Sequence, residues 1–398
     1  MSINAGPVPN LSCSVFDGDF TPTCLSNGVV GITPGPNPLI PSPDKTGPLA
    51  TVVAGFIQSS QSDLVEEFAP APYPLGLDIR ANGFSMRENP DRVALKRQAL
   101  NMRRGELVTE MTFLAGDVPL EIEVLQFASR SVRCMLCQKV TIKPALGVEI
   151  EISAIVDPAG PGVTEYAKGI RGAATQAPDP SADTLDHVMG FASNRGSRLG
   201  IAVVVPRNQG VRKVASGRHI MEGRAGQAQF VQTLAAMVSD IYHPDPHMEA
   251  VRLARWADMV GFDDMRDQNR AAWEEIWQSR IKVGGASPED QCAIDAAFYY
   301  LQSNIHSSSR TGYPPAGLAS TPAGHGHNTW SMDVWTMIPT VLVQPEAART
   351  MVEYRFRGLE EARRRAALFG CRGAQYPREA GITGDDTTPT SLAVAWAA

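Results

Sequence analysis

The sequence lacks an excess of positive charge and lacks a long apolar run. Its 398 residues have a formal net charge of −6, and 20% of them are charged. No general basic field would therefore attract nucleic acid or an anionic membrane surface. Because no stretch of about 18 consecutive apolar residues occurs, no transmembrane helix is expected. The N-terminus also lacks the basic and apolar segments of a signal peptide, so we expect a cytoplasmic protein.

The six cysteines are too scattered to predict a disulfide framework in a chain of this length. Cys134 and Cys137 form one CxxC pair, but they lie in an apolar run that predicts a strand. Residues three apart on a strand point to opposite faces, and no second cysteine or histidine pair follows, so we expect no zinc site. No Walker A or GxGxxG motif is present. No metal or organic cofactor is implied.

Residues 1–240 have the pattern of β-strands. Apolar residues alternate with glutamates at 120–124 and 148–152, which predicts strands with one buried and one exposed face. Further apolar runs follow at 199–205 and 230–238, separated from one another by Pro/Gly-rich breaks. Many strands with no helical pattern between them favour an antiparallel β-sandwich.

The apolar period becomes helical after residue 246. One helix is predicted to begin near 251, Gly261 interrupts the pattern, and a second helix is predicted over about 264–280. These helices have the character of a connector. We interpret residues 241–286 as a helical linker between two domains.

Residues 287–398 predict a series of paired helices. Ser287 is a suitable N-cap, and the proline and acidic residues after it suit a first helical turn. Further helices are predicted at about 333–342, 345–357 and 359–369. The sequence as a whole therefore predicts a multidomain β + α protein.

Two loops of this helical part concentrate polar and aromatic side chains. The first loop contains His325, His327, Asn328, Trp330 and Asp333. The second contains residues 376–379 (YPRE), followed by 384–386 (GDD). A pyranose ring offers an apolar face to a tryptophan and hydroxyls to charged acceptors, so this combination suits a sugar site. The alternative interpretation is a packing role for Trp330 and a satisfied loop histidine at His327.

These segments resemble glycoside hydrolase family 65 in their order and spacing. Residues 326–333 (GHNTWSMD) are similar to the family's GHxFWDxE/D stretch, and residues 344–355 (QPEAARTMVEYR) to its PEAAR helix. Residues 373–379 (GAQYPRE) look like its GAxFPWES loop, and residues 384–389 resemble its G.E..P stretch. Upstream, residues 25–31 (LSNGVVG) are similar to the family's LxNGxxG signature.

The resemblance implies an N-terminal antiparallel β-sandwich, a helical linker and an (α/α)6 catalytic barrel. It implies inverting cleavage of an α-glucosidic bond in a glucose-containing disaccharide or glycoside. Members include phosphorylases of maltose, trehalose and kojibiose, and also hydrolases. The wording of residues 345–355 looks closest to the hydrolases of glucosylgalactosyl-hydroxylysine, which favours a hydrolase over a phosphorylase. Members are often dimers, so a homodimer is one expectation.

Position by position, the resemblance implies that Trp330 packs on the glucose ring. Asp333 takes the acidic position of the same motif, and Glu379 matches the glutamate of the second loop that bonds sugar hydroxyls. We include His327 with these three residues as a candidate for substrate binding.

Two positions depart from the family pattern. Ser331 stands where the family has a sugar-binding aspartate, and Arg378 stands where it has a tryptophan. Losing a carboxylate that bonds sugar hydroxyls costs about 1.5–3 kcal/mol of binding free energy if its charged hydrogen bond is not replaced.

The family's general acid is a glutamate in a DEYH-like motif, and no such motif occurs in these 398 residues. We therefore expect the acid beyond Ala398 and expect the chain as given to be inactive. Twelve helices of about 12 residues with loops of about 5 need roughly 200 residues, whereas residues 287–398 supply only about half of these. We expect a partial (α/α)6 barrel with apolar helix faces open to water.

Several alternatives stay open. The chain is a non-catalytic carbohydrate-binding remnant, an α-glucoside phosphorylase in its full-length form, or half of a barrel that a partner chain completes. A separate two-carboxylate enzyme is a further alternative, since two carboxylates about 6.5–9.5 Å apart suffice for inverting hydrolysis. Its candidate residues are Asp333, Glu379, Asp385 and Asp386.

Overall fold

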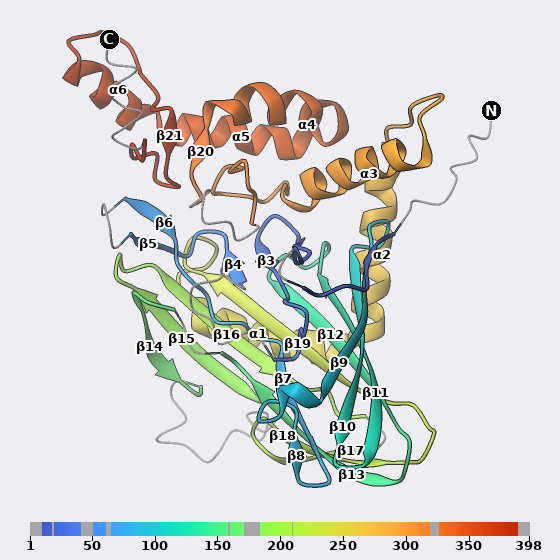
Figure 1. The fold of residues 1–398 in the computed structure, drawn as a ribbon. Helices are drawn as coiled ribbons and strands as arrows, with labels where there is room; N and C mark the ends of the chain where they lie inside the picture. The colour runs from blue at the N-terminus through green and yellow to red at the C-terminus, as the bar shows by residue number, and fades with distance from the viewer. Residues whose placement is uncertain are drawn as a thin grey trace.

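The structure is a computed structural model, in which strands come first along the chain and helices follow (Figure 1). It describes residues 10–17, 20–40, 51–60, 65–157, 160–170, 184–208, 210–318 and 326–388. His325 of the first polar loop and Pro389 after the second lie outside these ranges.

A nine-stranded antiparallel sheet forms one layer of the N-terminal part (Figure 1). In spatial order its strands are β1 (Leu11–Cys13), β9 (Val93–Asn101), β10 (Glu106–Ala115), β11 (Val118–Ala128), β12 (Met135–Pro144), β19 (Gln229–Ser239), β16 (Arg198–Val204), β15 (His187–Ser193) and β14 (Val163–Lys168). In β11, Leu120, Ile122 and Val124 are buried while Glu121 and Glu123 are exposed. The alternation in the sequence is therefore the alternation of burial, and the strand prediction for this run is confirmed.

A five-stranded antiparallel sheet forms the second layer. Its order is β17 (Val211–Ala215), β18 (Arg218–Gly223), β13 (Val148–Ile155), β7 (Gly76–Ala81) and β8 (Phe84–Ser85). Side chains from both sheets meet in one buried apolar cluster, which includes Ile79 and Ile150 from this sheet and Phe113 and Ile122 from the larger one. Two sheets packed through such a cluster make the expected antiparallel β-sandwich.

Shorter strands lie at the end of the sandwich that faces the helices (Figure 1). They are β2 (Leu25–Ser26), β3 (Val30–Ile32) and β4 (Thr51–Val53) in one ladder and β5 (Ile57–Ser59) and β6 (Glu66–Phe68) in another, while a 3-10 turn covers Pro90–Arg92. Val52, Ala54 and Phe68 of these strands are buried together with Leu318 of the helical part. The two parts of the chain are therefore joined by an apolar contact.

The two linker helices pack on the sandwich. α1 (Pro246–Val260) lies against β16 and β19, and α2 (Phe262–Trp277) follows after Gly261, whose φ of 87° breaks the helix. α2 begins and ends a few residues earlier than the sequence suggested. Trp273 of α2 is buried with the core of the large sheet, so the linker is part of the same apolar core.

Polar contacts also hold α2 to the sandwich. Arg266 and Arg270 of α2 donate to the carboxylate of Glu106 over 2.7–3.2 Å. Burial raises the pKa of the Glu106 carboxyl, but the hydrogen bonds and charges of the two arginines bring it below its ordinary value. The docking of α2 on the sandwich therefore stabilises the ionised form of Glu106.

The helical part begins at α3 (Pro288–Ser303), and the Ser287 hydroxyl caps it by accepting from the Asp290 amide. Next come a π-helical segment (Met332–Thr336), α4 (Met337–Val343), α5 (Pro345–Arg357) and α6 (Leu359–Leu368). The predictions of an N-cap at Ser287 and a helix over 345–357 are confirmed. The predicted helix at 333–342 begins as a π-helix, which its apolar pattern did not indicate.

These helices form a layer above one end of the sandwich, not a closed ring (Figure 1). They expose large apolar side chains to solvent, including Trp335 (77% exposed), Leu342 (81%) and Phe356 (73%). The expected partial barrel with open apolar faces is confirmed. Within the described ranges, no helix has both the length and the apolar character required to cross a membrane.

Candidate functional site

The two polar loops are joined by a short antiparallel ladder. β20 (Asn328–Thr329) pairs with β21 (Glu379–Ala380), which places Thr329 opposite Glu379. The amide of Trp330 extends the ladder by donating to the carbonyl of Arg378 at 3.3 Å. The predicted residues of both loops are therefore brought together.

Trp330 and Asp333 lie where the chain turns from β20 into the π-helical segment. Trp330 is 40% exposed. The Asp333 carboxylate accepts from Arg355 of α5, whose Nη2 lies at 2.9 Å and whose Nε lies at 3.2 Å. Because Arg355 also donates to the carbonyl of Thr329 at 3.1 Å, Asp333 and Arg355 together fix this turn. A sugar hydroxyl at Asp333 would share its oxygens with Arg355.

His327 lies beneath the ladder and is 5% exposed. Its Nε2 is 2.5 Å from the backbone carbonyl oxygen of Glu66, and its Nδ1 is 3.5 Å from Oε2 of Glu379. Since a carbonyl can only accept, Nε2 is the nitrogen that donates. His327 therefore bonds the sandwich at Glu66, and its Nδ1 can donate to Glu379 only when both ring nitrogens carry a proton. These contacts fit the satisfied loop histidine better than a direct sugar contact.

The two positions that depart from the family pattern lie beside this ladder. Ser331 is exposed, and its hydroxyl contacts that of Thr329. Arg378 is half-buried next to Glu379 in the chain. A polar hydroxyl and a cation thus replace a carboxylate and an indole at the rim of the site.

The other two carboxylates of the second loop lie in ion pairs. Asp385 pairs with Arg195 at 2.9 Å, and Asp386 pairs with Arg365. Asp333 is likewise paired with Arg355. Three of the four carboxylates considered for a separate two-carboxylate enzyme are therefore engaged in ion pairs with arginines. Glu379, half-buried beside His327, is the fourth. This arrangement does not favour an independent acid–base centre.

The sequence analysis missed two residues that contact the site, Glu66 and Arg355. Arg355 lies in the segment that resembles the family helix, and its partner Asp333 is 22 residues away. Glu66 is 261 residues from His327 in the sequence, and its surroundings predict only a short strand. No local signal identified Glu66.

Other features of the described residues lie elsewhere. Hollows of about 420 Å³ and about 240 Å³ occur on the linker and on the sandwich, the first lined by Arg103, Arg104 and Arg270 and the second by Arg133 and other residues. Neither is lined by the predicted residues. Among the residues that the structure describes, no three histidines, cysteines or carboxylates form a group suited to a metal ion.

What the arrangement offers is a platform for an uncharged polyol. A partly exposed indole, a half-buried carboxylate and two hydroxyl groups in contact with each other lie along or next to the β20–β21 ladder. An indole packs against the apolar face of a sugar ring, and a carboxylate accepts from its hydroxyls.

Comparison with known proteins finds relatives that are named as enzymes acting on glucosides. The chain is 24% identical over 381 residues to a kojibiose hydrolase of Flavobacterium johnsoniae, an alignment that covers 92% of this chain and 53% of that protein. It is 32% identical over 145 residues to the protein-glucosylgalactosylhydroxylysine glucosidase of Danio rerio, covering 34% of this chain and 22% of that protein. The chain thus spans about half the length of the Flavobacterium relative.

A solved structure described as a candidate kojibiose phosphorylase from the human microbiome superposes with a TM-score of 0.74. That match has 15% sequence identity and covers 91% of this chain and 50% of that one, and it shows a shared fold.

Sequence profiles of one family match both parts of the chain. The glycosyl hydrolase family 65 N-terminal domain matches residues 23–276, which include the sandwich and linker helices. The central catalytic domain of the same family matches residues 296–396, which include the two polar loops. The chain therefore belongs to glycosyl hydrolase family 65.

Proposed function

We propose that this chain supplies the glucose-binding part of an enzyme that acts on α-glucosides. The observation that supports this function is the β20–β21 ladder, because it joins the two polar loops and places Trp330 and Glu379 on adjoining strand ends. Trp330 would cover the apolar face of a glucose ring, and Glu379 would accept from its hydroxyls.

The substrate we propose is a glucose disaccharide such as kojibiose, cleaved with inversion by water rather than phosphate. Two relatives named as kojibiose hydrolases support this choice. A phosphorylase is the second candidate, because relatives named as kojibiose phosphorylases match about a third of the chain. Release of free glucose without added phosphate would distinguish a hydrolase from a phosphorylase in a protein that contains the acid.

Inverting cleavage requires a general acid on one side of the bond and an activated acceptor on the other. Asp333, Asp385 and Asp386 lie in ion pairs with arginines, which leaves Glu379 as a single carboxylate where two groups are required. We therefore expect the 398-residue chain to bind α-glucosides without cleaving them.

The test is calorimetric titration of the purified chain with kojibiose, maltose and trehalose. Replacing Glu379 by Gln removes a charged acceptor, so we expect affinity for the bound sugar to fall about tenfold or more. Trp330→Ala removes the stacking surface, and we expect a loss of similar size.

Trp335→Ala is the matched control, because Trp335 is a tryptophan of the adjacent π-helical segment and is 77% exposed. We expect it to leave the affinity unchanged. Equal losses for Trp335→Ala and Trp330→Ala, or no sugar binding by the unmodified chain, would rule out the proposed site.

A further inference from the structure

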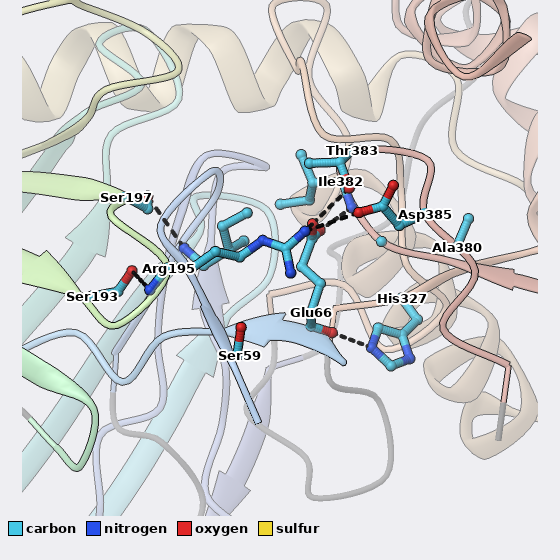
Figure 2. Close-up of polar contacts among 12 residues, drawn as sticks. Ser59, Glu66, Ser193, Arg195, Ser197, His327, Ala380, Ile382, Thr383 and Asp385 are labelled. Carbon is cyan, nitrogen blue, oxygen red and sulfur yellow. Dashed lines mark hydrogen bonds and ion pairs between the residues drawn. The ribbon is translucent and has the colours of Figure 1, made fainter. Parts of the chain in front are cut away.

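One carboxylate of the sandwich reaches into the second polar loop. Glu66 lies in β6, and its side chain is 2% exposed. Its Oε1 accepts from the amide of Ile382, and its Oε2 accepts from the hydroxyl of Thr383 at 2.8 Å. These contacts begin two residues after β21, so the loop that contains Glu379 is tied to the sandwich (Figure 2).

A cation completes this contact from a third segment. Arg195, in the turn between β15 and β16, lies 3.5 Å from Oε2 of Glu66 and 2.9 Å from Oδ2 of Asp385 (Figure 2). The neighbouring Asn194 side chain bonds the amide of Ser59 at 2.9 Å and its carbonyl at 3.0 Å. The turn with Arg195 is therefore held against β5, the partner strand of β6.

The backbone of Glu66 contacts the first polar loop. Its carbonyl accepts from Nε2 of His327 at 2.5 Å, while Nδ1 of His327 lies 3.5 Å from the Glu379 carboxylate. A single residue of the sandwich thus contacts both loops, one through its side chain and the other through its main chain.

The loop has no spare room on the side of Glu66. A Cβ atom added at Gly381 would lie 2.5 Å from Oε1 and 2.7 Å from Cδ of Glu66. On the other side, the hydroxyl of Tyr354 donates to the carbonyl of Gly381 at 2.6 Å. The chain that leaves β21 is therefore fixed between α5 and the Glu66 carboxylate.

We propose that Glu66 is a positioning residue for glucoside binding. It anchors the segment that follows β21, the strand that carries Glu379, and its carbonyl holds His327, whose Nδ1 lies 3.5 Å from the Glu379 carboxylate. The inference rests on the proposed function for the sugar contacts, but the anchoring of the loop stands on the contacts of Glu66 alone. Without Glu66 the loop opens locally, and the site loses affinity while the sandwich and helices stay folded.

The test replaces Glu66 by Gln in the full 398-residue chain. Glutamine keeps the size of the side chain and one acceptor oxygen but loses the charge that faces Arg195 and one of the two acceptors. We expect amide hydrogen exchange in peptides covering 376–388 to become about tenfold faster or more, because local opening needs less free energy. We expect kojibiose affinity to fall about fivefold or more, with exchange in the sandwich core unchanged.

Glu67→Gln is the matched control, since Glu67 is the next residue of the same strand, and it is less buried. It should change loop exchange and affinity less than about twofold. Gly381→Ala provides a second approach that leaves Glu66 intact, because the added methyl displaces its carboxylate. We expect it to accelerate exchange in the same peptides.

Three outcomes would contradict the inference. One is unchanged loop exchange in both Glu66→Gln and Gly381→Ala. Another is equal acceleration in the loop and in the sandwich core, which indicates a general structural role. The third is faster loop exchange with wild-type affinity. If the unmodified chain binds no glucoside, the proposed function fails, while local acceleration of exchange still supports the anchoring.

Discussion

His306 is half-buried where the helical part meets the sandwich, in surroundings that disfavour a positive charge. Burial, and then the charge of nearby Arg130, lowers the pKa of His306 from 6.5 to about 4. Its Nδ1 accepts from the hydroxyl of Ser308 at 2.7 Å and from the Ser308 amide at 3.1 Å. The folded chain therefore contains neutral His306 at pH values where the unfolded chain begins to protonate it.

This difference makes stability fall in mild acid. The pKa of the folded state lies below that of the unfolded state, so the contribution is complete above about pH 6.5 and is lost as the pH falls toward 4. We expect the free energy of unfolding to decrease by about 2 kcal/mol between pH 8 and pH 5 through His306 alone. Urea unfolding at several pH values measures the decrease. His306→Asn keeps an acceptor for Ser308, and an equally steep decrease in this variant would contradict the prediction.

At the scale of single residues, the sequence identifies candidates in continuous motifs but not residues whose partners are distant in the chain. Trp330 and Glu379 could be proposed as sugar-binding residues because each lies in a continuous motif whose chemistry suits a sugar. Glu66 was not found, because its partners His327 and Ile382 are 261 and 316 residues away. Side-chain contacts over such separations exist only after the sandwich and the helices have docked.

Helices and strands were predicted where local chemistry determines them. The segment Pro345–Arg357 begins with a proline at its first turn and ends before a glycine, and the helix has those bounds. The two-residue strands β20 and β21 had no such signal, because each is stabilised by the other across about fifty residues. The β20–β21 ladder, which joins the two polar loops, could therefore not be predicted from the periodicity of the sequence.

A buried ion pair joins the end of the linker to the first helix of the helical part. Arg280 donates to Asp295 of α3 at 2.8 Å through Nε and at 2.6 Å through Nη2. Asp295 is fully buried, and it also accepts from Gln291 at 3.1 Å. We expect Asp295→Asn to lower the free energy of unfolding by about 3–5 kcal/mol, because the Arg280 charge loses its buried partner.

The measurement is chemical denaturation followed by tryptophan fluorescence. Glu289→Gln is the control on the same helix, since Glu289 is exposed in its first turn. It should cost only about 0.5 kcal/mol through the helix dipole. Similar losses in the two variants would show that the Arg280–Asp295 pair contributes no more than a surface charge.

At the scale of the whole molecule, the apolar side chains between the sheets of the sandwich are buried, whereas the helical layer leaves large apolar side chains exposed. One face of the large sheet packs on the smaller sheet, and α1, α2 and α3 contribute to the apolar core that the large sheet shares with them. By contrast, α4, α5 and α6 expose large apolar side chains to solvent, among them Ile338, Leu342, Phe356 and Leu368. The sequence analysis predicted this difference from length, because residues 287–398 supply only about half of the residues that twelve barrel helices need.

Exposed apolar faces of this kind should bind an apolar dye. We expect the folded chain to enhance the fluorescence of anilinonaphthalene sulfonate, and Leu342→Lys combined with Phe356→Lys to reduce that enhancement by roughly half or more. Leu342 is 81% exposed and Phe356 is 73% exposed, so the double variant should change the free energy of unfolding by less than about 1 kcal/mol. Leu114→Lys is the control, because Leu114 is a 41% exposed leucine of β10 on the sandwich. If Leu114→Lys reduced dye binding as much as the double variant, or if the double variant left it unchanged, the dye would not be bound by the exposed side chains of α4 and α5.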